Sequence, residues 1–144
     1  MTAMTNDLVK LTAEAEKKGI RDGKFRQKLH LMPPAGWLND PNGLCQFRGI
    51  YHAFFQYSPF NAEGGVKMWG HYTSLNMIDW EYQGVILYPD QPFGCSGVYS
   101  GCAFIEDGEM YLYYTGNVKL EDSEDYDYIN SGRESNTVLV TSMD

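Results

Sequence analysis

No stretch of this 144-residue chain approaches the roughly 18 consecutive apolar residues that a membrane-spanning helix needs. Residues 1–19 mix charged and apolar side chains and lack the uninterrupted apolar core of a secretory signal peptide. A glycine-rich phosphate loop is also missing, because the Gly64-Gly65 pair is followed by Val-Lys-Met and not by a Lys-Ser/Thr that opens a helix. These absences predict a cytoplasmic protein without a membrane partner.

Basic residues and cysteines are scarce as well. The chain has 11 Lys and Arg against 19 Asp and Glu, a formal net charge of −8, whereas nucleic-acid binders usually carry a basic stripe. We therefore expect no nucleic-acid partner. The three cysteines are odd in number and show no Cys-x-x-Cys spacing, which argues against a disulfide framework and suits a reducing compartment. We expect Cys45, Cys95 and Cys102 to be small buried residues in strands.

Aromatic residues are abundant by contrast, with 11 Tyr, 7 Phe and 3 Trp in short runs that glycines interrupt. Such runs favour β structure. Arg48-Gly49 and Asp107-Gly108 predict tight hairpin turns, because Gly accepts the positive φ that these turns require. The predicted strands fall in residues 43–57 and 98–115, each a hairpin, and in residues 69–76, 80–88 and 136–142. Their even spacing is typical of a sandwich, a barrel or a propeller, and periodicity does not choose among these.

One helix is expected before the strands, over residues 5–18. Leu8, Leu11 and Ala15 recur at spacings of three and four, which predicts an amphipathic helix packed on the outside of the main body. Gly19 suits the position after its last turn. The candidates for its N-terminal cap are Thr5, Asn6 and Asp7.

The segment from Trp37 to Gly43 is Trp-Leu-Asn-Asp-Pro-Asn-Gly. Taken alone, its last four residues are typical of an ordinary turn, which Asp caps, Pro restricts and Gly closes. The preceding Trp and Asn and the following aromatic strand change this interpretation. The segment resembles the Trp-Met-Asn-Asp-Pro-Asn-Gly signature of glycoside hydrolase family 32, with Leu38 replacing Met at conserved volume.

The resemblance continues in chain order and covers residues 27–144. The further matching motifs are Tyr51 to Tyr57, Trp69-Gly70-His71, Asp79-Trp80, Tyr88-Pro89-Asp90, Val98 to Ala103 and Tyr113 to Gly116. The bacterial sucrose-6-phosphate hydrolase branch of the family is similar also in its short N-terminal helix and its Tyr-Ser-Gly-Ser-Ala run. Cys102 replaces the second Ser of that run.

This resemblance implies an all-β fold: a partial five-bladed β-propeller of about two to three blades, preceded by a short N-terminal α-helix. It implies an N-terminal helical extension over residues 1–23 and a truncated N-terminal part of the catalytic domain over residues 24–144. It also implies a retaining double displacement in which Asp40 attacks the anomeric carbon of a terminal fructosyl unit. A second carboxylate, about 5–5.5 Å from the first in retaining enzymes, would protonate the leaving sugar and then activate water.

Five other residues match the family's sugar site, and each also has a simpler interpretation. Asn39 would bind the sugar or orient the nucleophile, or only stabilise a turn. Gln56 would donate to the nucleophile or to a fructose hydroxyl, or occupy an exposed strand position. Trp69 would form an apolar wall against the fructose ring, or belong to the core. Tyr99 and Ser100 would line the fructose pocket, or be ordinary strand residues.

Two later acidic motifs of the family, Arg-Asp-Pro and Glu-Cys, do not occur in this sequence, and the Glu of the second is the family's acid/base. Arg21-Asp22 is followed by Gly23 and precedes the nucleophile, and no Glu precedes a cysteine. At roughly 40–50 residues a blade, the β part also provides only about half of five blades. We therefore expect a truncated chain that carries the nucleophile, lacks the acid/base and is inactive alone.

No cofactor or metal is expected. His30, His52 and His71 lie about twenty residues apart without a paired ligand, so they are predicted to be satisfied structural histidines. Residues 117–135 are polar and acidic, and their spacing matches no EF-hand loop, so a solvated surface loop is predicted.

Three functions stay open: a fructosyl hydrolase, a fructosyltransferase of the same fold that uses a sugar hydroxyl in place of water, and a non-catalytic sugar-binding remnant. The expected partner is a small sugar, namely sucrose, sucrose 6-phosphate or a short fructan. A phosphate pocket would need converging Lys or Arg side chains, for which Lys67, Lys119 and Arg133 are the candidates. The sequence gives no indication of the oligomeric state.

Overall fold

One helix and two antiparallel sheets make up the computed structural model, which describes residues 3–27, 29–127 and 130–144, with side chains from residue 6 onward. Helix α1 (Ala3–Arg21) comes first. Sheet A has the order β1 (Trp37–Phe47), β2 (Ile50–Ser58), β3 (Met68–Ser74) and β4 (Glu81–Leu87). A 3₁₀ turn (Pro92–Gly94) leads into sheet B, with the order β5 (Gly97–Glu106), β6 (Glu109–Lys119) and β7 (Arg133–Ser142).

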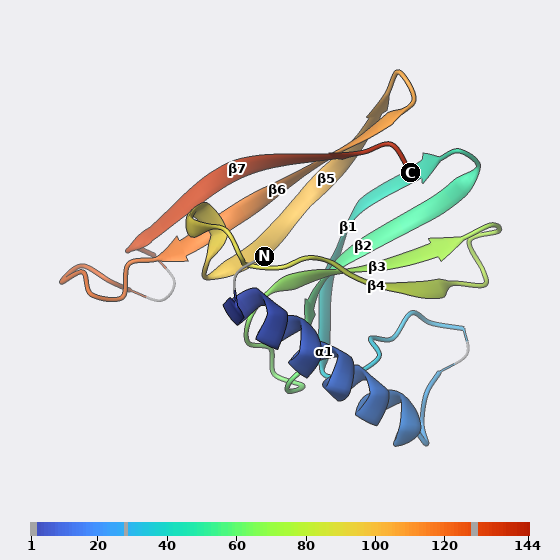
Figure 1. Ribbon diagram of the computed structural model, residues 1–144, viewed down its shortest axis with the longest axis horizontal. Coiled ribbons are helices and arrows are strands. Elements are labelled where there is room, and N and C mark those ends of the chain that lie inside the picture. The colour runs from blue at the N-terminus through green and yellow to red at the C-terminus, as the bar shows by residue number, and fades with distance from the viewer. Residues whose placement is uncertain (1–2, 28, 128–129) are drawn as a thin grey trace.

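The two sheets are arranged as neighbouring propeller blades. Their first strands, β1 and β5, lie side by side in the middle of the molecule, and the later strands fan outward on either side (Figure 1). Each sheet is a meander in which every strand pairs with the next one along the chain. The expected all-β, partial-propeller fold with an N-terminal helix is confirmed. The described residues form two sheets, each of which corresponds to one blade.

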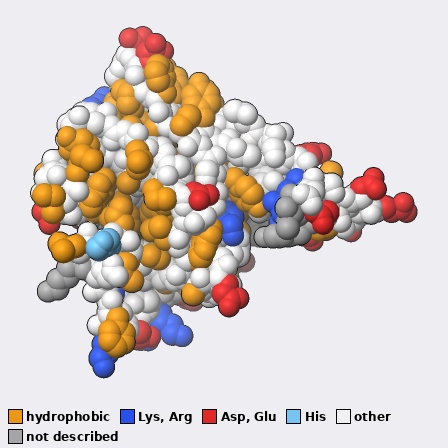
Figure 2. All heavy atoms as spheres, turned by 180° about the vertical axis from the view of Figure 1, so that it is seen from behind, with side chains coloured by type: hydrophobic (Ala, Val, Ile, Leu, Met, Phe, Trp, Pro, Cys, Tyr) orange, Lys and Arg blue, Asp and Glu red, His pale blue; other side chains and the backbone are white. Residues whose placement is uncertain are grey.

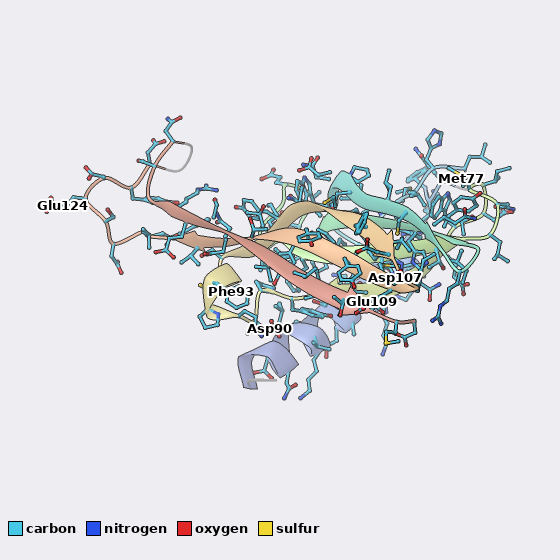
Figure 3. The ribbon with its side chains drawn as sticks, turned by 90° about the horizontal axis from the view of Figure 1, so that it is seen from above. Met77, Asp90, Phe93, Asp107, Glu109 and Glu124 are labelled. Carbon is cyan, nitrogen blue, oxygen red and sulfur yellow. The ribbon has the colours of Figure 1, made fainter. Side chains whose placement is uncertain are left out.

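The predicted strands are confirmed, but β1 begins at Trp37 and not at residue 43, and the other strands differ by smaller shifts at their ends. Turns at Arg48-Gly49 and Asp107-Gly108 close the β1–β2 and β5–β6 hairpins, and all four residues have positive φ. The described part of the acidic segment between β6 and β7, residues 120–127 and 130–132, is a mostly exposed loop, with Glu124 at its far tip (Figure 3). Residues 117–119 belong to β6 and residues 133–135 belong to β7, because these two strands pair along their whole length. The loop is therefore shorter at both ends than predicted.

The core lies between the two sheets. Seven buried residues from both sheets form it: Phe47, Phe54, Trp69, Val98, Met110, Leu112 and Tyr114. A second buried cluster occupies the other face of sheet A, with Ala53, Phe55, Tyr57 and Tyr72. Strand β2 supplies large aromatic side chains to both clusters, which explains why its sequence is apolar without the alternation of a half-exposed strand.

Helix α1 packs against the outside of sheet A, as expected, but its buried face and its ends differ from the prediction. Leu11 is 53% exposed, whereas Thr12 is only 2% exposed. Glu16 accepts a hydrogen bond of 2.6 Å from the Tyr82 hydroxyl of β4. Burial, followed by this hydrogen bond, raises the pKa of Tyr82, so the phenol stays a donor. The hydrogen bond between Glu16 and Tyr82 thus holds the helix against sheet A, and the spacing of the apolar residues in the helix does not indicate this contact.

The helix also runs past its predicted end. Gly19 lies inside α1, which continues to Arg21, and Asn6 and Asp7 lie within the helix and not at its cap. The side chain of the third candidate, Thr5, lies outside the described set. A Cβ atom on Gly19 would come within 2.4 Å of the Pro34 carbonyl oxygen. The absence of a side chain at Gly19 therefore lets the segment before β1 pack closely against the helix, and Gly19 does not end the helix.

Exposed apolar side chains gather over one side of the back of the molecule (Figure 2). Among the large hydrophobic residues that are exposed are Phe25, Leu29, Leu75, Met77 and Ile78.

Within the described residues, no helix is long and apolar enough to cross a membrane.

The cysteine prediction is wrong for two of the three residues. Cys95 and Cys102 are exposed, and only Cys45 is partly buried. Cys95 lies in the turn after the 3₁₀ segment, and Cys102 is on the face of β5 that points away from the core. All three thiols are free, and burial raises the pKa of the Cys45 thiol.

Two histidines that lie far apart in sequence meet on neighbouring strands of sheet A. His52 Nδ1 and His71 Nε2 are 3.0 Å apart, and the Phe54 ring stacks on His71 at 4.4 Å between centroids. Burial, and then the neighbouring His52, lowers the pKa of His71 to about 4. The folded protein therefore holds His71 neutral at pH values where a free histidine is protonated.

This shift predicts that the fold loses stability as the pH falls from about 6.5 toward 4. The unfolded chain then binds a proton that the folded chain does not, at a cost of about 1.4 kcal/mol per pH unit and up to roughly 3 kcal/mol in total. H71Q should flatten this slope in denaturant titrations at several pH values. H30Q, at an exposed histidine, should leave the slope intact, and equal slopes in the wild type and H71Q would contradict the prediction.

Candidate active site

Asp40 lies on the inner strand of sheet A, at a break in its pairing with β2. Asn39 pairs with Gln56 and Pro41 with Phe55, so Asp40 is the extra residue of a bulge, and its φ is 38°. The turn interpretation of Asp-Pro-Asn-Gly is therefore wrong: these residues belong to β1. Proline is tolerated because β1 is an edge strand of its sheet. Bulges redirect side chains, and the Asp40 side chain is exposed.

Ser100 occupies the same kind of position on the inner strand of sheet B. Tyr99 pairs with Thr115 and Gly101 with Tyr114, so Ser100 has no partner in β6. Its hydroxyl donates to Asp40 Oδ2 at 3.0 Å. The two bulges thus bring together side chains from adjacent blades that are 60 residues apart in the sequence.

Both carboxylate oxygens of Asp40 accept a hydrogen bond. Asn39 Nδ2 donates to Oδ1 at 2.8 Å, while Ser100 donates to Oδ2. Gln56 Nε2 in turn donates to the Ser100 oxygen at 2.9 Å. Among the described residues, every hydrogen bond to this carboxylate comes from a neutral group. The arrangement fixes the plane of the carboxylate and leaves its negative charge available for chemistry.

Three predicted site residues therefore surround Asp40. The contact from Asn39 is the orienting one that the sequence suggested. Gln56 is only 6% exposed, so the alternative of an exposed strand position is wrong. Its donor reaches Asp40 through Ser100 and not directly, a connection that the sequence pattern did not indicate.

Trp69 occupies a different place from the predicted wall of the sugar site. Its side chain is 0% exposed, and its ring lies between Phe54 and Tyr114 at centroid distances of 5.8 and 6.1 Å. The indole Nε1 donates to the Tyr99 carbonyl oxygen at 3.0 Å. Trp69 thus belongs to the core, and it fixes the backbone of β5 next to Ser100.

Two cations that the sequence offered only as candidates contact residues that are near Asp40 or Ser100 in the sequence. The Lys67 ammonium is 4.3 Å from the centre of the Trp37 ring, on the strand that carries Asp40. Arg133 Nη1 donates to the Tyr99 hydroxyl at 3.2 Å. Tyr99 is half-buried and directly precedes Ser100. No spacing rule connects these residues, because the contacts join four separate strands or loops.

A metal centre is not apparent in the part of the chain that the structure describes. No group of three or more His, Cys, Asp or Glu side chains converges there.

This chain is similar to known proteins in sequence and in fold. Residues 30–140 match the Glycosyl hydrolases family 32 N-terminal domain. Sucrose-6-phosphate hydrolase of Bacillus subtilis (strain 168) is 45% identical over 111 residues, 76% of this chain and 23% of its own length. Raffinose invertase of Escherichia coli is 50% identical over 108 residues, 74% of this chain and 23% of its own. The chain thus spans about a quarter of the length of these relatives.

A solved structure with the same fold covers nearly the whole chain. It is the Bombyx mori GH32 beta-fructofuranosidase, as a mutant in complex with sucrose, with a TM-score of 0.78 and 29% identity over 99% of this chain and 28% of its own. The fold, the family match and the identity to curated relatives agree with one another. This chain therefore belongs to glycoside hydrolase family 32 and matches the family's N-terminal domain over residues 30–140.

Proposed function

We propose that this chain contributes the nucleophile to a retaining hydrolase of terminal β-fructosyl bonds in sucrose or sucrose 6-phosphate. The observation that carries the proposal is the pair of bulges, which presents an exposed carboxylate with both oxygens held by neutral donors from two blades. The relatives' names, sucrose-6-phosphate hydrolase and raffinose invertase, support the substrate class.

In the proposed first step, one oxygen of Asp40 attacks the anomeric carbon of the fructosyl unit, and the glycosidic C–O bond breaks. The leaving sugar takes a proton from a general acid, and the fructosyl unit stays as an ester of Asp40. Water, deprotonated by the same second group, then attacks the anomeric carbon and frees the carboxylate. Two inversions give net retention.

The neighbours of Asp40 have a positioning role in this mechanism. Asn39 and Ser100 hold the carboxylate plane before attack, which lowers the entropic cost of reaching a reactive geometry. Gln56 occupies the Ser100 lone pair, so the Ser100 proton points at Asp40. Tyr99 and Ser100 are proposed to line the fructose pocket, since Ser100 touches the carboxylate and Tyr99 directly precedes it.

The second carboxylate is proposed to come from outside residues 1–144. The motifs that would supply it are not in this sequence, and the chain spans 23% of its first curated relatives. General acid/base help is worth about 10²–10⁴-fold in rate. We therefore propose that the chain is a truncated part of a longer catalytic domain.

The chain of residues 1–144 alone is expected to show no hydrolysis of sucrose above the background rate. A sensitive assay for released glucose or fructose checks this, with the same chain carrying D40N as the matched blank. Turnover by the pure wild-type chain that D40N abolishes would contradict the proposed absence of the proton donor.

Product analysis on a protein that contains residues 1–144 and turns over distinguishes the remaining functions. Fructose released with retained anomeric configuration supports the hydrolase, whereas transfer to a second sugar at low sucrose concentration supports the fructosyltransferase. If residues 1–144 and every longer protein that contains them bind sucrose without turning it over, the non-catalytic sugar-binding remnant is favoured.

A further inference from the structure

We propose that Asn42 is a positioning residue for the nucleophile: its buried side-chain amide holds the peptide group that follows Asp40 and so fixes the bulge that directs the carboxylate. This inference rests on the proposed function and deepens it, because it names a residue that acts on the reaction through Asp40 without touching the sugar.

The peptide group between Asp40 and Pro41 has a single backbone atom that can form a hydrogen bond. Proline has no N–H, so only the Asp40 carbonyl oxygen is left. Asp40 is the extra residue of the bulge and has no partner in β2. Asn42 Nδ2 donates to this carbonyl oxygen at 2.7 Å. The Asn42 amide thus anchors a peptide group that the register between β1 and β2 passes over.

This anchor matters because Asp40 has an uncommon backbone conformation. Its φ is 38°, and residues other than glycine rarely adopt positive φ. Such conformations persist where the surrounding structure holds them, and they concentrate at functional sites. The orientation of the peptide group after Asp40 defines the ψ angle of Asp40, so a contact that holds this group also holds the bulge. The bulge in turn sends the carboxylate toward the Ser100 hydroxyl on the next blade.

The surroundings of Asn42 keep its amide in place. Asn42 is only 8% exposed and pairs with Phe54, which belongs to the core between the sheets. A Cβ atom on Gly43 would lie 2.7 Å from Cδ2 of Phe54, so the ring packs against the backbone directly after Asn42. The Asn42 side chain is therefore confined before any substrate binds, as the preorganisation of a reacting group requires.

The other polar atom of the same amide indicates what the residue is for. Asn42 Oδ1 is buried and has no hydrogen-bond partner among the described residues. An unpaired buried acceptor destabilises a fold, and an apolar side chain of the same shape avoids that cost. Leucine would therefore serve the core better than asparagine at this position. The donor that the amide supplies to Asp40 explains why a polar side chain is buried here.

The test is steady-state kinetics of sucrose hydrolysis in an active protein that contains residues 1–144. N42L removes the donor and keeps the branched skeleton of the side chain. It is expected to lower kcat by about 10- to 100-fold, the scale of a small misplacement of a reacting group. KM should change little, because Asn42 acts on the nucleophile and not on sugar binding. N42A, which cannot overpack the core, should show the same loss of kcat.

N136L is the matched control. The Asn136 side chain also donates from Nδ2 to a backbone carbonyl oxygen, that of Phe93, at 3.0 Å. This hydrogen bond joins β7 to the 3₁₀ turn. Its loss should leave kcat and KM unchanged. The denaturant midpoint of N42L should be no lower than that of N136L, so that the two variants differ in kcat and not in stability.

Two outcomes would overturn the inference alone. The first is a kcat within about twofold of the wild type in both N42L and N42A, while D40N is inactive. Asp40 would then remain the nucleophile, and only the role of Asn42 would be lost. The second is a kcat that falls with the denaturant midpoint in the Asn42 and Asn136 variants alike, because the amide would then only stabilise the fold. If D40N itself keeps the wild-type kcat, the inference and the proposed function are both wrong.

Discussion

Replacement of Asp40 by asparagine is expected to lower kcat/KM for sucrose hydrolysis by at least about 10⁴-fold, the order seen when a member of a nucleophilic catalytic group is removed. The measurement uses a protein that contains residues 1–144 and is active. An amide cannot form the fructosyl ester, although it has the size of the carboxylate, and its single oxygen can accept only one of the two hydrogen bonds that Asn39 and Ser100 donate to Asp40. Because asparagine tolerates positive φ as well as aspartate does, the bulge should persist.

D107N is the matched control for this substitution. Asp107 also has positive φ, at 50°, and is exposed. It lies in the β5–β6 turn, at the other end of sheet B from Glu124 and from the beginning of β5 (Figure 3). Its replacement should leave kcat/KM unchanged. A D40N protein that retains more than a hundredth of the wild-type kcat/KM would exclude Asp40 as the nucleophile.

Replacement of Trp69 by alanine is expected to destabilise the fold by about 3–5 kcal/mol, the usual cost of truncating a buried Trp or Phe. The side chain is fully buried between the sheets and donates to the backbone of β5. Its loss would leave a cavity and an unpaired carbonyl group on Tyr99. Denaturant unfolding followed by circular dichroism measures the change in free energy.

Two further variants separate the core role of Trp69 from a role in sugar binding. W69F keeps most of the ring and should cost less than W69A, while losing the hydrogen bond to Tyr99. F104A, at a residue that is 51% exposed on β5, should cost much less. If W69A were to weaken sucrose binding with little change in the free energy of unfolding, the ring would contact the sugar after all.

The hairpins were predictable from local sequence, and so was the choice of Asp40 as the candidate nucleophile. Asp107-Gly108 and Arg48-Gly49 require positive φ within two residues, so the turns follow from the chain itself. The family signature around Asp40 indicated this carboxylate as the candidate nucleophile. These predictions needed no knowledge of distant contacts.

The helix shows where local patterns mislead. Its apolar stripe predicted a buried Leu11, but the surface available on sheet A presents the Tyr82 hydroxyl, and Glu16 binds it. Gly19 resembled a helix end because the sequence does not reveal the Pro34 backbone that packs against it. In both cases a partner distant in sequence determined the outcome.

The sequence by itself determined the fold class, most of the strand positions and Asp40 as the candidate nucleophile, because these depend on turn chemistry, on alternation and on one contiguous motif. Only the tertiary structure decided that β1 begins at Trp37, that Ser100 and not Gln56 touches Asp40, and that Trp69 is buried. These contacts join strands of different blades, and the distance between blades is set by how their side chains pack, which no spacing along the chain encodes.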